Sequence, residues 1–403
     1  MSSRSFGFSG GGSGGGPSPG GGIIVLGSGL CSAERCGVNN SASGYYTTVL
    51  GRCNTASGCA STIGGGQQNT ASASYSTVGG GLCNTASGNY SIISGGYQNT
   101  VPAGCSFIGS GYQNINNQVN SVIVGGALNC LCATGDSTSS FIGGGQCNTM
   151  SNYGNSIAVL VGGCGNSISG YSDSAGFIGG GVFNTLSSCY GKYNFIGGGL
   201  QNKLCNTTCQ VNYGSVIVGG IGHNTTGGTF DYASGNYTTN PTGYCEAGRL
   251  SFIGGGFENK ASSFLATVGG GGCNTASGYY STVGGGRLNT ASSKLATVGG
   301  GGINTASCTY STVSGGYFNT ASGYCSTIGG GGCNTALANY SGILGGINNT
   351  ASNNYSFIAG SNIVTDRDCT TFVNNLSIKS IPTSSAGLPA GSVWNDLGTL
   401  KIV

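Results

Sequence analysis

A unit of 15 residues recurs along most of the chain, and this repeat constrains the fold more than any other feature of the sequence. It is plain in STVGGGLCNTASGNY (residues 76–90), STVGGGRLNTASSKL (281–295) and STIGGGGCNTALANY (326–340). Self-similarity at a fixed period is the signature of a repeat architecture. An Asn anchors each unit, and the anchors are Asn39, Asn54, Asn69, Asn84, Asn99, Asn114 and Asn129, then Asn148, Asn166, Asn184, Asn202 and Asn224 at looser spacing, then Asn259, Asn274, Asn289, Asn304, Asn319, Asn334 and Asn349, with Asn362 last.

Each unit contains two short alternating segments, Tyr-Ser-Thr-Val and Asn-Thr-Ala-Ser, separated by Gly-rich corners. Alternation that is rich in β-branched residues and bounded by Gly and Asn is typical of strands. The spacing of an amphipathic helix is absent from the pattern. The sequence therefore predicts an all-β fold, a parallel β-solenoid (β-roll) of about 15-residue coils over residues 23–365, with irregular, longer coils at 130–250.

The recurring residue types suit such a coil. Val78 and Val283 represent an inward aliphatic column, and Ala86 and Ala291 represent a facing column of small residues. Gly triplets supply positive φ or close backbone approach at a tight corner. Asn tolerates the left-handed region and bonds to nearby backbone, so we expect the anchors to lie in turns and to stack as an amide ladder with an architectural role.

Composition excludes several classes of function. The chain of 403 residues has 85 Gly, 12 Lys plus Arg, 9 Asp plus Glu and a single His, His223. General acid-base catalysis needs positioned titratable groups, and nucleic-acid binding needs clustered cations. We therefore predict a protein without catalytic residues, cofactor or metal, and without a nucleic-acid partner. His223 is interpreted as a turn residue, and the lack of about 20 consecutive apolar residues argues against membrane insertion.

The two ends differ from the repeat. Residues 1–22 are rich in Gly, Ser and Pro and are interpreted as a flexible tether. They lack the apolar core of a secretory signal, so we expect synthesis in the cytoplasm and release by another route. Residues 366–403 are predicted to form a small β module with strands at 376–381, 392–395 and 399–403. Trp394 would cap the open end of the solenoid.

Cysteine and tyrosine suggest how copies associate. Cys occurs 19 times, and before the anchor it alternates with Gln68, Leu288 and Phe318, which favours small buried hydrophobic residues over disulfides between chains. A Tyr precedes the Ser-Thr-Val segment in many units and would form a second apolar stripe. We therefore predict that this stripe is buried between chains, most simply in a homotrimer.

The repeat also resembles a known family. NTASGNYSIISGG (84–96) and NTASGYYSTVGGG (274–286) are similar to the YadA-like head repeats of trimeric autotransporter adhesins. That resemblance covers about residues 22–364 and implies parallel β-rolls wound three chains together. The tail, LPAGSVWNDLGTLKIV, is similar to short C-terminal modules of phage and virus fibre proteins. The chain lacks the heptad stalk and barrel anchor of an autotransporter, so the resemblance implies a fibre of a phage or virus particle.

Specificity is expected in the irregular middle, because long excursions from a rigid scaffold often carry binding. The largest excursion, residues 225–249, carries Phe230, Tyr232, Tyr237 and Tyr244 among small polar residues, a composition typical of recognition loops. These four aromatics are the candidate receptor-binding residues, although they could instead cover a widened coil.

The sequence thus predicts a non-enzymatic structural fibre or adhesin at the virion surface. It would be held to a virion or tail component by its N-terminus and would bind a host-surface glycan or protein. A self-assembling filament or appendage subunit without a receptor is the alternative. Rows of Thr such as Thr77 and Thr282 also suggest an ice-binding solenoid, but the paired Thr-x-Thr motif of such surfaces is absent.

Overall fold

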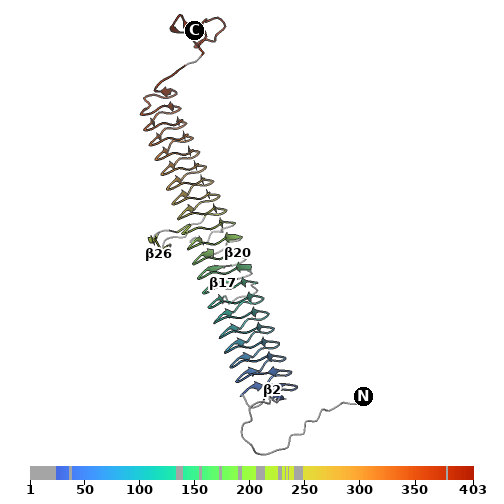
Figure 1. Cartoon of the computed structure of the whole chain (residues 1–403). Coiled ribbons are helices and arrows are strands. Elements are labelled where there is room, and N and C mark those ends of the chain that lie inside the picture. Colours follow the sequence, from blue (N-terminus) through green and yellow to red (C-terminus); the bar gives the residue numbers. More distant parts are fainter. Residues whose placement is uncertain are drawn as a thin grey trace, which may run out of the picture. The chain divides into compact units, whose positions relative to one another are not determined.

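The structure, a computed structural model, confirms the predicted solenoid. It describes residues 24–35, 39–132, 139–153, 157–171, 175–188, 193–205, 214–225, 229–231, 233–234, 236–239, 248–377 and 380–403. These residues contain no helix and build a parallel β-solenoid of about 19 turns, with coils of about 15 residues (Figure 1). Two compact units divide the chain, Met1–Gly145 and Gln146–Val403.

In the first unit each coil gives one short strand to each of two faces, which we name face A and face B. Face A holds β1 (Ile24–Leu26), β2 (Ala33–Arg35), β4 (Thr48–Val49), β6 (Thr62–Ile63), β8 (Thr77–Val78), β10 (Ile92–Ile93), β12 (Phe107–Ile108), β14 (Val122–Ile123) and β16 (Phe141–Ile142). Face B holds β3 (Ser41–Ala42), β5 (Thr55–Ala56), β7 (Thr70–Ala71), β9 (Thr85–Ala86), β11 (Thr100–Val101), β13 (Ile115–Asn116) and β15 (Cys130–Leu131).

The second unit repeats this plan. Its face A holds β18 (Ile157–Leu160), β20 (Ala175–Ile178), β22 (Asn194–Ile196), β24 (Val216–Ile217), β27 (Phe252–Ile253), β29 (Thr267–Val268), β31 (Thr282–Val283), β33 (Thr297–Val298), β35 (Thr312–Val313), β37 (Thr327–Ile328), β39 (Gly342–Ile343), β41 (Phe357–Ala359) and β42 (Thr371–Val373). Face B holds β17 (Thr149–Tyr153), β19 (Ser167–Tyr171), β21 (Thr185–Ser188), β23 (Lys203–Cys205), β28 (Lys260–Ala261), β30 (Thr275–Ala276), β32 (Thr290–Ala291), β34 (Thr305–Ala306), β36 (Thr320–Ala321), β38 (Thr335–Ala336) and β40 (Thr350–Ala351).

Equivalent residues of successive coils lie directly over one another. Val283 pairs with Val298 in β31 and β33, and Ala291 pairs with Ala306 in β32 and β34. All four side chains are fully buried, as are the anchor Asn side chains between them and the Ser residues before β31 and its equivalents. The predicted inward columns are therefore confirmed.

Longer coils are predicted to bulge outward. The two strands of the largest excursion, β25 (Thr229–Asp231) and β26 (Asn236–Thr239), do leave the solenoid, but for the described coils between residues 139 and 205 the prediction is wrong (Figure 1). The extra residues lengthen the strands, so that β17 has five residues and β18 has four, against two in a regular coil. A wider coil needs larger side chains to fill it, and Met150 and Ile168 accordingly replace Ala in the face B column. From Ile63 to Ile343, each buried aliphatic residue on face A precedes the next anchor by six positions, so the variation in length lies in the turn that connects face B to face A.

Two residues of each regular coil adopt left-handed backbone conformations, and neither is the anchor Asn. One is the residue before the anchor, such as Ile303 (φ 56°), and the other is the residue before the buried Ser, such as Tyr280 (φ 58°). The predicted place of Asn in the left-handed region is thus wrong. The third Gly of the triplet also needs positive φ: at Gly286 (φ 84°) a Cβ would clash with the carbonyl oxygen of Gly301.

The described ends of the solenoid differ from its coils. β1 pairs with β2 in antiparallel register, and Glu34 in β2 accepts a hydrogen bond at Oε2 from the Ala42 N–H (2.9 Å). At the other end, β43 (Val393–Asp396) and β44 (Thr399–Ile402) form an antiparallel pair with each other, close to two predicted strands. No strand covers the described part of 376–381, and the cap role predicted for Trp394 is not confirmed.

Candidate recognition site

An antiparallel hairpin leaves the second unit within the predicted excursion. β25 (Thr229–Asp231) pairs with β26 (Asn236–Thr239), visible at the left in Figure 1. At its tip, Asp231 accepts hydrogen bonds from the N–H groups of Ala233 (2.9 Å) and Ser234 (3.2 Å). A hydrogen bond from the Ser234 side chain, followed by the bond from the Ala233 N–H, lowers the pKa of the Asp231 carboxyl. The excursion therefore has strand and turn structure of its own.

The structure places two of the four candidate aromatics in this hairpin. Phe230 in β25 is paired in register with Tyr237 in β26. Tyr232 and Tyr244 lie outside the described residues. Tyr237 is half-buried, and its hydroxyl donates a hydrogen bond to Oε1 of Glu258 (3.0 Å). Tyr237 thus holds the hairpin against a coil.

Glu258 connects the hairpin to the solenoid surface. It occupies the left-handed position before anchor Asn259 (φ 48°), and its Oε2 accepts a bond from the Cys273 thiol one coil further on (3.8 Å). Burial, followed by the negative charge of Glu258, raises the pKa of both Tyr237 and Cys273. Both groups remain protonated at neutral pH and donate hydrogen bonds to Glu258. These bonds position the hairpin and the next coil relative to Glu258.

The ladder beneath the hairpin contains a histidine. In a regular coil Asn289 accepts the N–H of Asn304 (3.0 Å) at Oδ1 and donates from Nδ2 to the carbonyls of Gly285 and Gly301 (both 2.9 Å). His223 fills this place between Asn202 and Asn259: its N–H donates to Oδ1 of Asn202 (3.0 Å), and its Nδ1 accepts the N–H of Asn259 (3.1 Å). The interpretation of His223 as a turn residue therefore missed its role in the ladder.

His223 is fully buried, and its remaining nitrogen is poorly satisfied. Nε2 lies near the carbonyl of Gly219, but it makes no hydrogen bond of normal geometry to a described residue. Burial lowers the pKa of His223 to about 4, and the carbonyl of Gly219 opposes this only in part. The imidazole is therefore neutral at pH 7 and acts as a structural acceptor.

Three predicted anchors are wrong by one position. Asn224 lies in the left-handed region (φ 54°), and its Nδ2 is buried without a partner among the described residues. Asn40, followed by Ser-Ala, is the first anchor in place of Asn39, because it accepts the N–H of Asn54 (3.0 Å). Ile363 takes the place expected for Asn362, since its N–H donates to Asn349 (3.0 Å). The Asn-Ser-Ala pattern could have identified Asn40, whereas no sequence signal marks His223.

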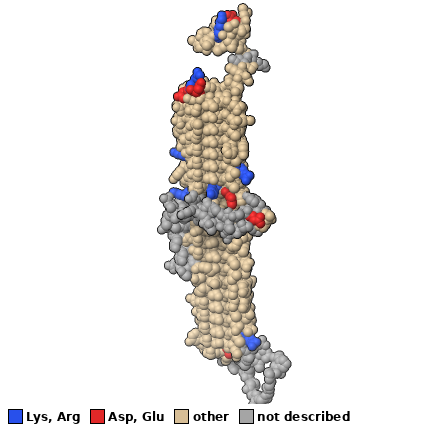
Figure 2. All heavy atoms as spheres, turned by 90° about the vertical axis from the view of Figure 1, so that its left-hand side faces the viewer, with Lys and Arg blue, Asp and Glu red and all other residues tan. Residues whose placement is uncertain are grey.

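Charged residues gather around the hairpin. The sequence has none between Arg52 and Asp136 or between Lys294 and Asp366. Figure 2 shows Lys, Arg, Asp and Glu in a band at the level of the hairpin on this face. The described charged residues from Lys203 to Lys294, the part of the sequence around the hairpin, are Lys203, Asp231, Arg249, Glu258, Lys260, Arg287 and Lys294. The hairpin and this band together form the most chemically varied surface of the described coils.

The Tyr stripe, predicted to be buried, is exposed in the single chain. Tyr75 and Tyr90 stack with ring centroids 4.9 Å apart, and Tyr340 and Tyr355 stack at 4.8 Å. These rings are 47–59% exposed. Each stacked contact covers one face of each ring and leaves the ring edges and hydroxyls exposed.

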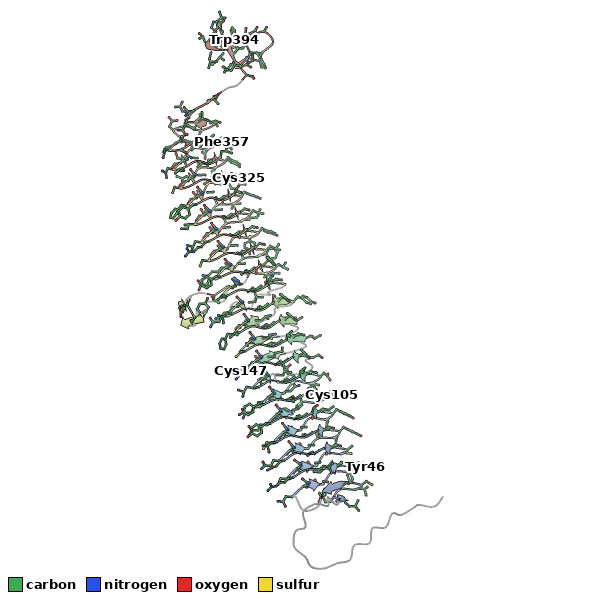
Figure 3. All side chains as sticks on the ribbon, in the orientation of Figure 1. Tyr46, Cys105, Cys147, Cys325, Phe357 and Trp394 are labelled. Atoms are coloured by element: carbon green, nitrogen blue, oxygen red, sulfur yellow. A yellow bond between two sulfur atoms is a disulfide. The ribbon has the colours of Figure 1, made fainter. Side chains whose placement is uncertain are left out.

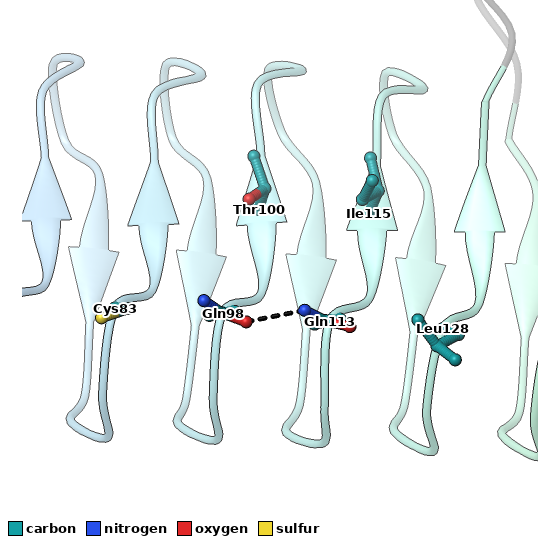
Figure 4. A pocket seen from close by; sticks show the side chains of 6 residues that line it. All are labelled: Cys83, Gln98, Thr100, Gln113, Ile115 and Leu128. Carbon is teal, nitrogen blue, oxygen red and sulfur yellow. Dashed lines mark hydrogen bonds between the residues drawn. The ribbon is translucent and has the colours of Figure 1, made fainter.

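A shallow groove of about 440 Å³ runs across face B of the first unit (Figure 4). Thr100 and Ile115 line one side, and the left-handed column lines the other with Cys83, Gln98, Gln113 and Leu128. Gln113 Nε2 donates to Gln98 Oε1 (2.7 Å). The lining is uncharged, so the groove offers amide and hydroxyl contacts without a group suited to acid-base catalysis.

Cysteines were predicted to be small buried residues, which is wrong for the free cysteines that the structure describes. All of these are exposed or half-exposed, and Figure 3 shows Cys105, Cys147 and Cys325 at the surface of their coils. Cys130 and Cys132 form a disulfide. Among the described residues, His, Cys, Asp and Glu form no cluster of three that could hold a metal ion, and no helix there is long and apolar enough to cross a membrane.

Comparison with known proteins does not assign the chain to a family. No model of a known protein family matches it. No curated protein matches it either.

Proposed function

We propose that this protein is a non-enzymatic, homotrimeric fibre or adhesin of a phage or virus particle. Its coils carry the β25–β26 hairpin toward a glycan or protein of the host surface. Residues 1–22, which lie outside the described residues, attach it to a virion or tail component. The chain is made in the cytoplasm and acts at the virion surface after release.

One observation carries this proposal: the hairpin leaves the solenoid without interrupting it. The ladder continues from Asn202 through His223 to Asn259 although 36 residues separate the last two. Tyr237 fastens the hairpin to Glu258 on the coil surface. A loop with its own strands, held on a rigid support, is an arrangement suited to recognition. Three copies of a weakly binding loop would gain avidity.

The filament alternative has less support. A filament built by axial stacking needs open strand edges at both ends of the solenoid. At the N-terminal end, β1 covers the edge of β2 in antiparallel register, and the Glu34 carboxylate bonds to Ala42. Strand direction and an inserted charge both disfavour another coil there. Electron microscopy of purified protein distinguishes the two functions, because an adhesin gives discrete particles and a filament gives indefinite polymers.

The adhesin proposal is tested by replacing residues 226–247 with the short turn of a regular coil. The full chain and the variant are labelled and incubated with a panel of bacterial cells and immobilised surface glycans. We expect the variant to lose binding while its circular dichroism stays that of a β-solenoid. Tyr237→Phe, which removes the hydroxyl that bonds to Glu258 and Thr225 but keeps the hairpin, should weaken binding less.

Two outcomes would contradict this proposal in different ways. Binding that survives the replacement would remove the hairpin from the recognition site. A wild-type chain that binds no cell and no glycan on the panel would count against an adhesive function altogether.

A further inference from the structure

The outer side of face A is apolar over five successive coils of the second unit. We name this surface the apolar stripe, and its centre is the row Val159, Phe177, Phe195, Val216 and Phe252. These residues are paired in direct register from β18 through β20, β22 and β24 to β27. The rings of Phe177 and Phe195 stack with centroids 5.0 Å apart. The row is therefore continuous along the coils.

The rows on either side are apolar too. These residues lie two positions before or after the central row, and on the first side Tyr193 (φ 60°), Gly214 (φ 60°) and Leu250 (φ 54°) have left-handed backbone and belong to the same corner column as Tyr280. They are Ile157, Ala175, Tyr193, Gly214 and Leu250 on one side, and Val161, Gly179, Gly197, Val218 and Gly254 on the other. Tyr is the only one of these residues with a polar side-chain group, and none is charged. All three rows thus lack the charged rim of an ordinary solvated sheet.

The coil does not require this composition. On face B of the same coils the outward row is Thr149, Ser167, Thr185 and Lys203. On face A further along, the central row becomes Thr267, Thr282, Thr297, Thr312 and Thr327. A row of outward Thr side chains is therefore compatible with the same coil backbone. The apolar residues need a separate explanation.

The exposed area is large enough for a protein partner. Ile157, Val161 and Val218 are 63%, 49% and 49% exposed. Tyr193 and Phe252 are 72% and 38% exposed, which leaves about 150–280 Å² on these two aromatics alone if each ring buries about 150–250 Å² when covered. Contiguous apolar patches above a few hundred Å² mark interaction sites. At strand spacing, three rows over five coils span about 24 Å by 14 Å, which is about 340 Å² and somewhat less than half of the roughly 800 Å² that each partner contributes to a standard interface, so the stripe has the size of an interface centre.

The first unit has a shorter row of the same kind. Ile92, Phe107, Val122 and Phe141 are paired in register along β10, β12, β14 and β16. Its sequence has no charged residue from Cys53 through Gly135. Both units thus present an apolar centre on face A.

We propose that the apolar stripe is the surface through which copies of this chain pack together. A second copy is the favoured occupant because the stripe is uncharged, repeats at the coil spacing and therefore matches itself coil by coil in a parallel arrangement. Depletion of charge is the mark of an interface core. This inference rests on the proposed homo-oligomer and centres its contact on face A, beside the Tyr corner that the sequence suggested and that contributes Tyr193 and Leu250. The hairpin base at Glu258 and the Lys203–Lys260 side of the coils remain outside the contact.

The test makes the stripe resemble the coils that follow it. Phe177, Phe195 and Phe252 are all replaced by Thr, the residue found in the same row from Thr267 onward. The matched control is Phe357→Thr, which lies in the face A row outside the stripe and is 39% exposed, against 38% for Phe252. Mass is measured by light scattering during size-exclusion chromatography. Wild type and control should give a multiple of 39.5 kDa, and the triple variant should give 39.5 kDa at the same micromolar concentration.

Several outcomes would overturn the inference. A wild-type mass of 39.5 kDa would mean that something other than this chain covers the stripe, such as a different protein. A triple variant that keeps the wild-type mass, with unchanged circular dichroism, would place the contact elsewhere. If the triple variant is poorly folded, Val218→Lys, which changes one side chain at 49% exposure, serves in its place. Host binding is measured separately, so loss of adhesion with an intact oligomer would contradict the proposed function alone.

Discussion

Replacing His223 by Asn should stabilise the coil beneath the hairpin and remove its sensitivity to acid. His223 is neutral when folded because burial lowers its pKa to about 4, whereas the pKa of a histidine in the unfolded chain is near 6.5. Below pH 6.5 the unfolded chain therefore binds a proton that the folded chain does not. The free energy of unfolding falls as pH falls through this window, by about 2 kcal/mol at pH 5 and about 3 kcal/mol below pH 4.

Asn at this position also repairs the ladder. Its Nδ2 could donate to the carbonyls of Gly219 and Gly256, as Asn289 does to Gly285 and Gly301. Two such bonds contribute about 1–3 kcal/mol together at neutral pH. We therefore expect His223→Asn to be more stable than wild type at pH 7.5, and the difference to widen by about 2 kcal/mol at pH 5.

Hydrogen exchange measures this locally, which matters because long repeat arrays need not unfold in one step. The amides to follow are Lys203, which donates to the His223 carbonyl (3.0 Å), and Asn259, which donates to Nδ1. His223 is the only histidine, so no other imidazole contributes between pH 5 and 7.5. If protection at Asn259 depends on pH equally in wild type and variant, His223 does not titrate as argued here.

Three further substitutions test the coil itself by thermal unfolding. Asn289→Ala leaves the Asn304 N–H and the Gly285 carbonyl without this partner, while the Gly301 carbonyl keeps its bond from the Arg287 N–H, and the change should cost about 2–5 kcal/mol. The outward Thr290→Ala should change stability by less than about 0.5 kcal/mol, and equal effects of the two substitutions would contradict a structural ladder. Gly286→Ala places an Ala at positive φ with its Cβ against the Gly301 carbonyl, and it should cost more than about 2 kcal/mol. Gly285→Ala, with open space around its Cβ, should be nearly neutral. A harmless Gly286→Ala would show that the corner is not tight. Ile303→Asn should raise the free energy of unfolding by about 1 kcal/mol, because Asn tolerates the left-handed backbone (φ 56°), and Ile303→Val should leave it unchanged. A loss of stability with Asn would mean that the packing of the Ile303 side chain contributes more than its left-handed backbone costs.

The periodicity of the sequence was sufficient to predict the coil, its inward columns and the pairing of residues 15 apart. It misplaced Asn39, Asn224 and Asn362 because an Asn can satisfy a ladder position or a left-handed turn, and a consensus spacing does not distinguish the two. His223 could not be predicted, since an imidazole becomes a substitute for an amide only once its neighbours are fixed. The candidate site was predicted as a segment, but the Tyr237 bond to Glu258 joins residues whose proximity depends on the fold.

The apolar stripe was overlooked for a related reason. Val, Phe and Ile in a strand are equally consistent with core and surface when the strands have only two to four residues. The register of β18 with β20 and β22 shows that Phe177 and Phe195 point outward while Ile178 and Ile196 fill the core. Alternation within one strand was too short to settle this, and only the alignment of many strands reveals it.

From Ile63 to Ile343, the fixed distance of six positions between the buried aliphatic residue and the next anchor divides each coil into a corner of constant length and a corner of variable length, here called the free corner. Additions of three residues, or of a whole hairpin, enter at the free corner and leave the neighbouring coils in register. A gene for such a chain can exchange or extend a single loop without re-optimising the rest. The same property makes each free corner a natural place to graft a foreign peptide at a chosen height.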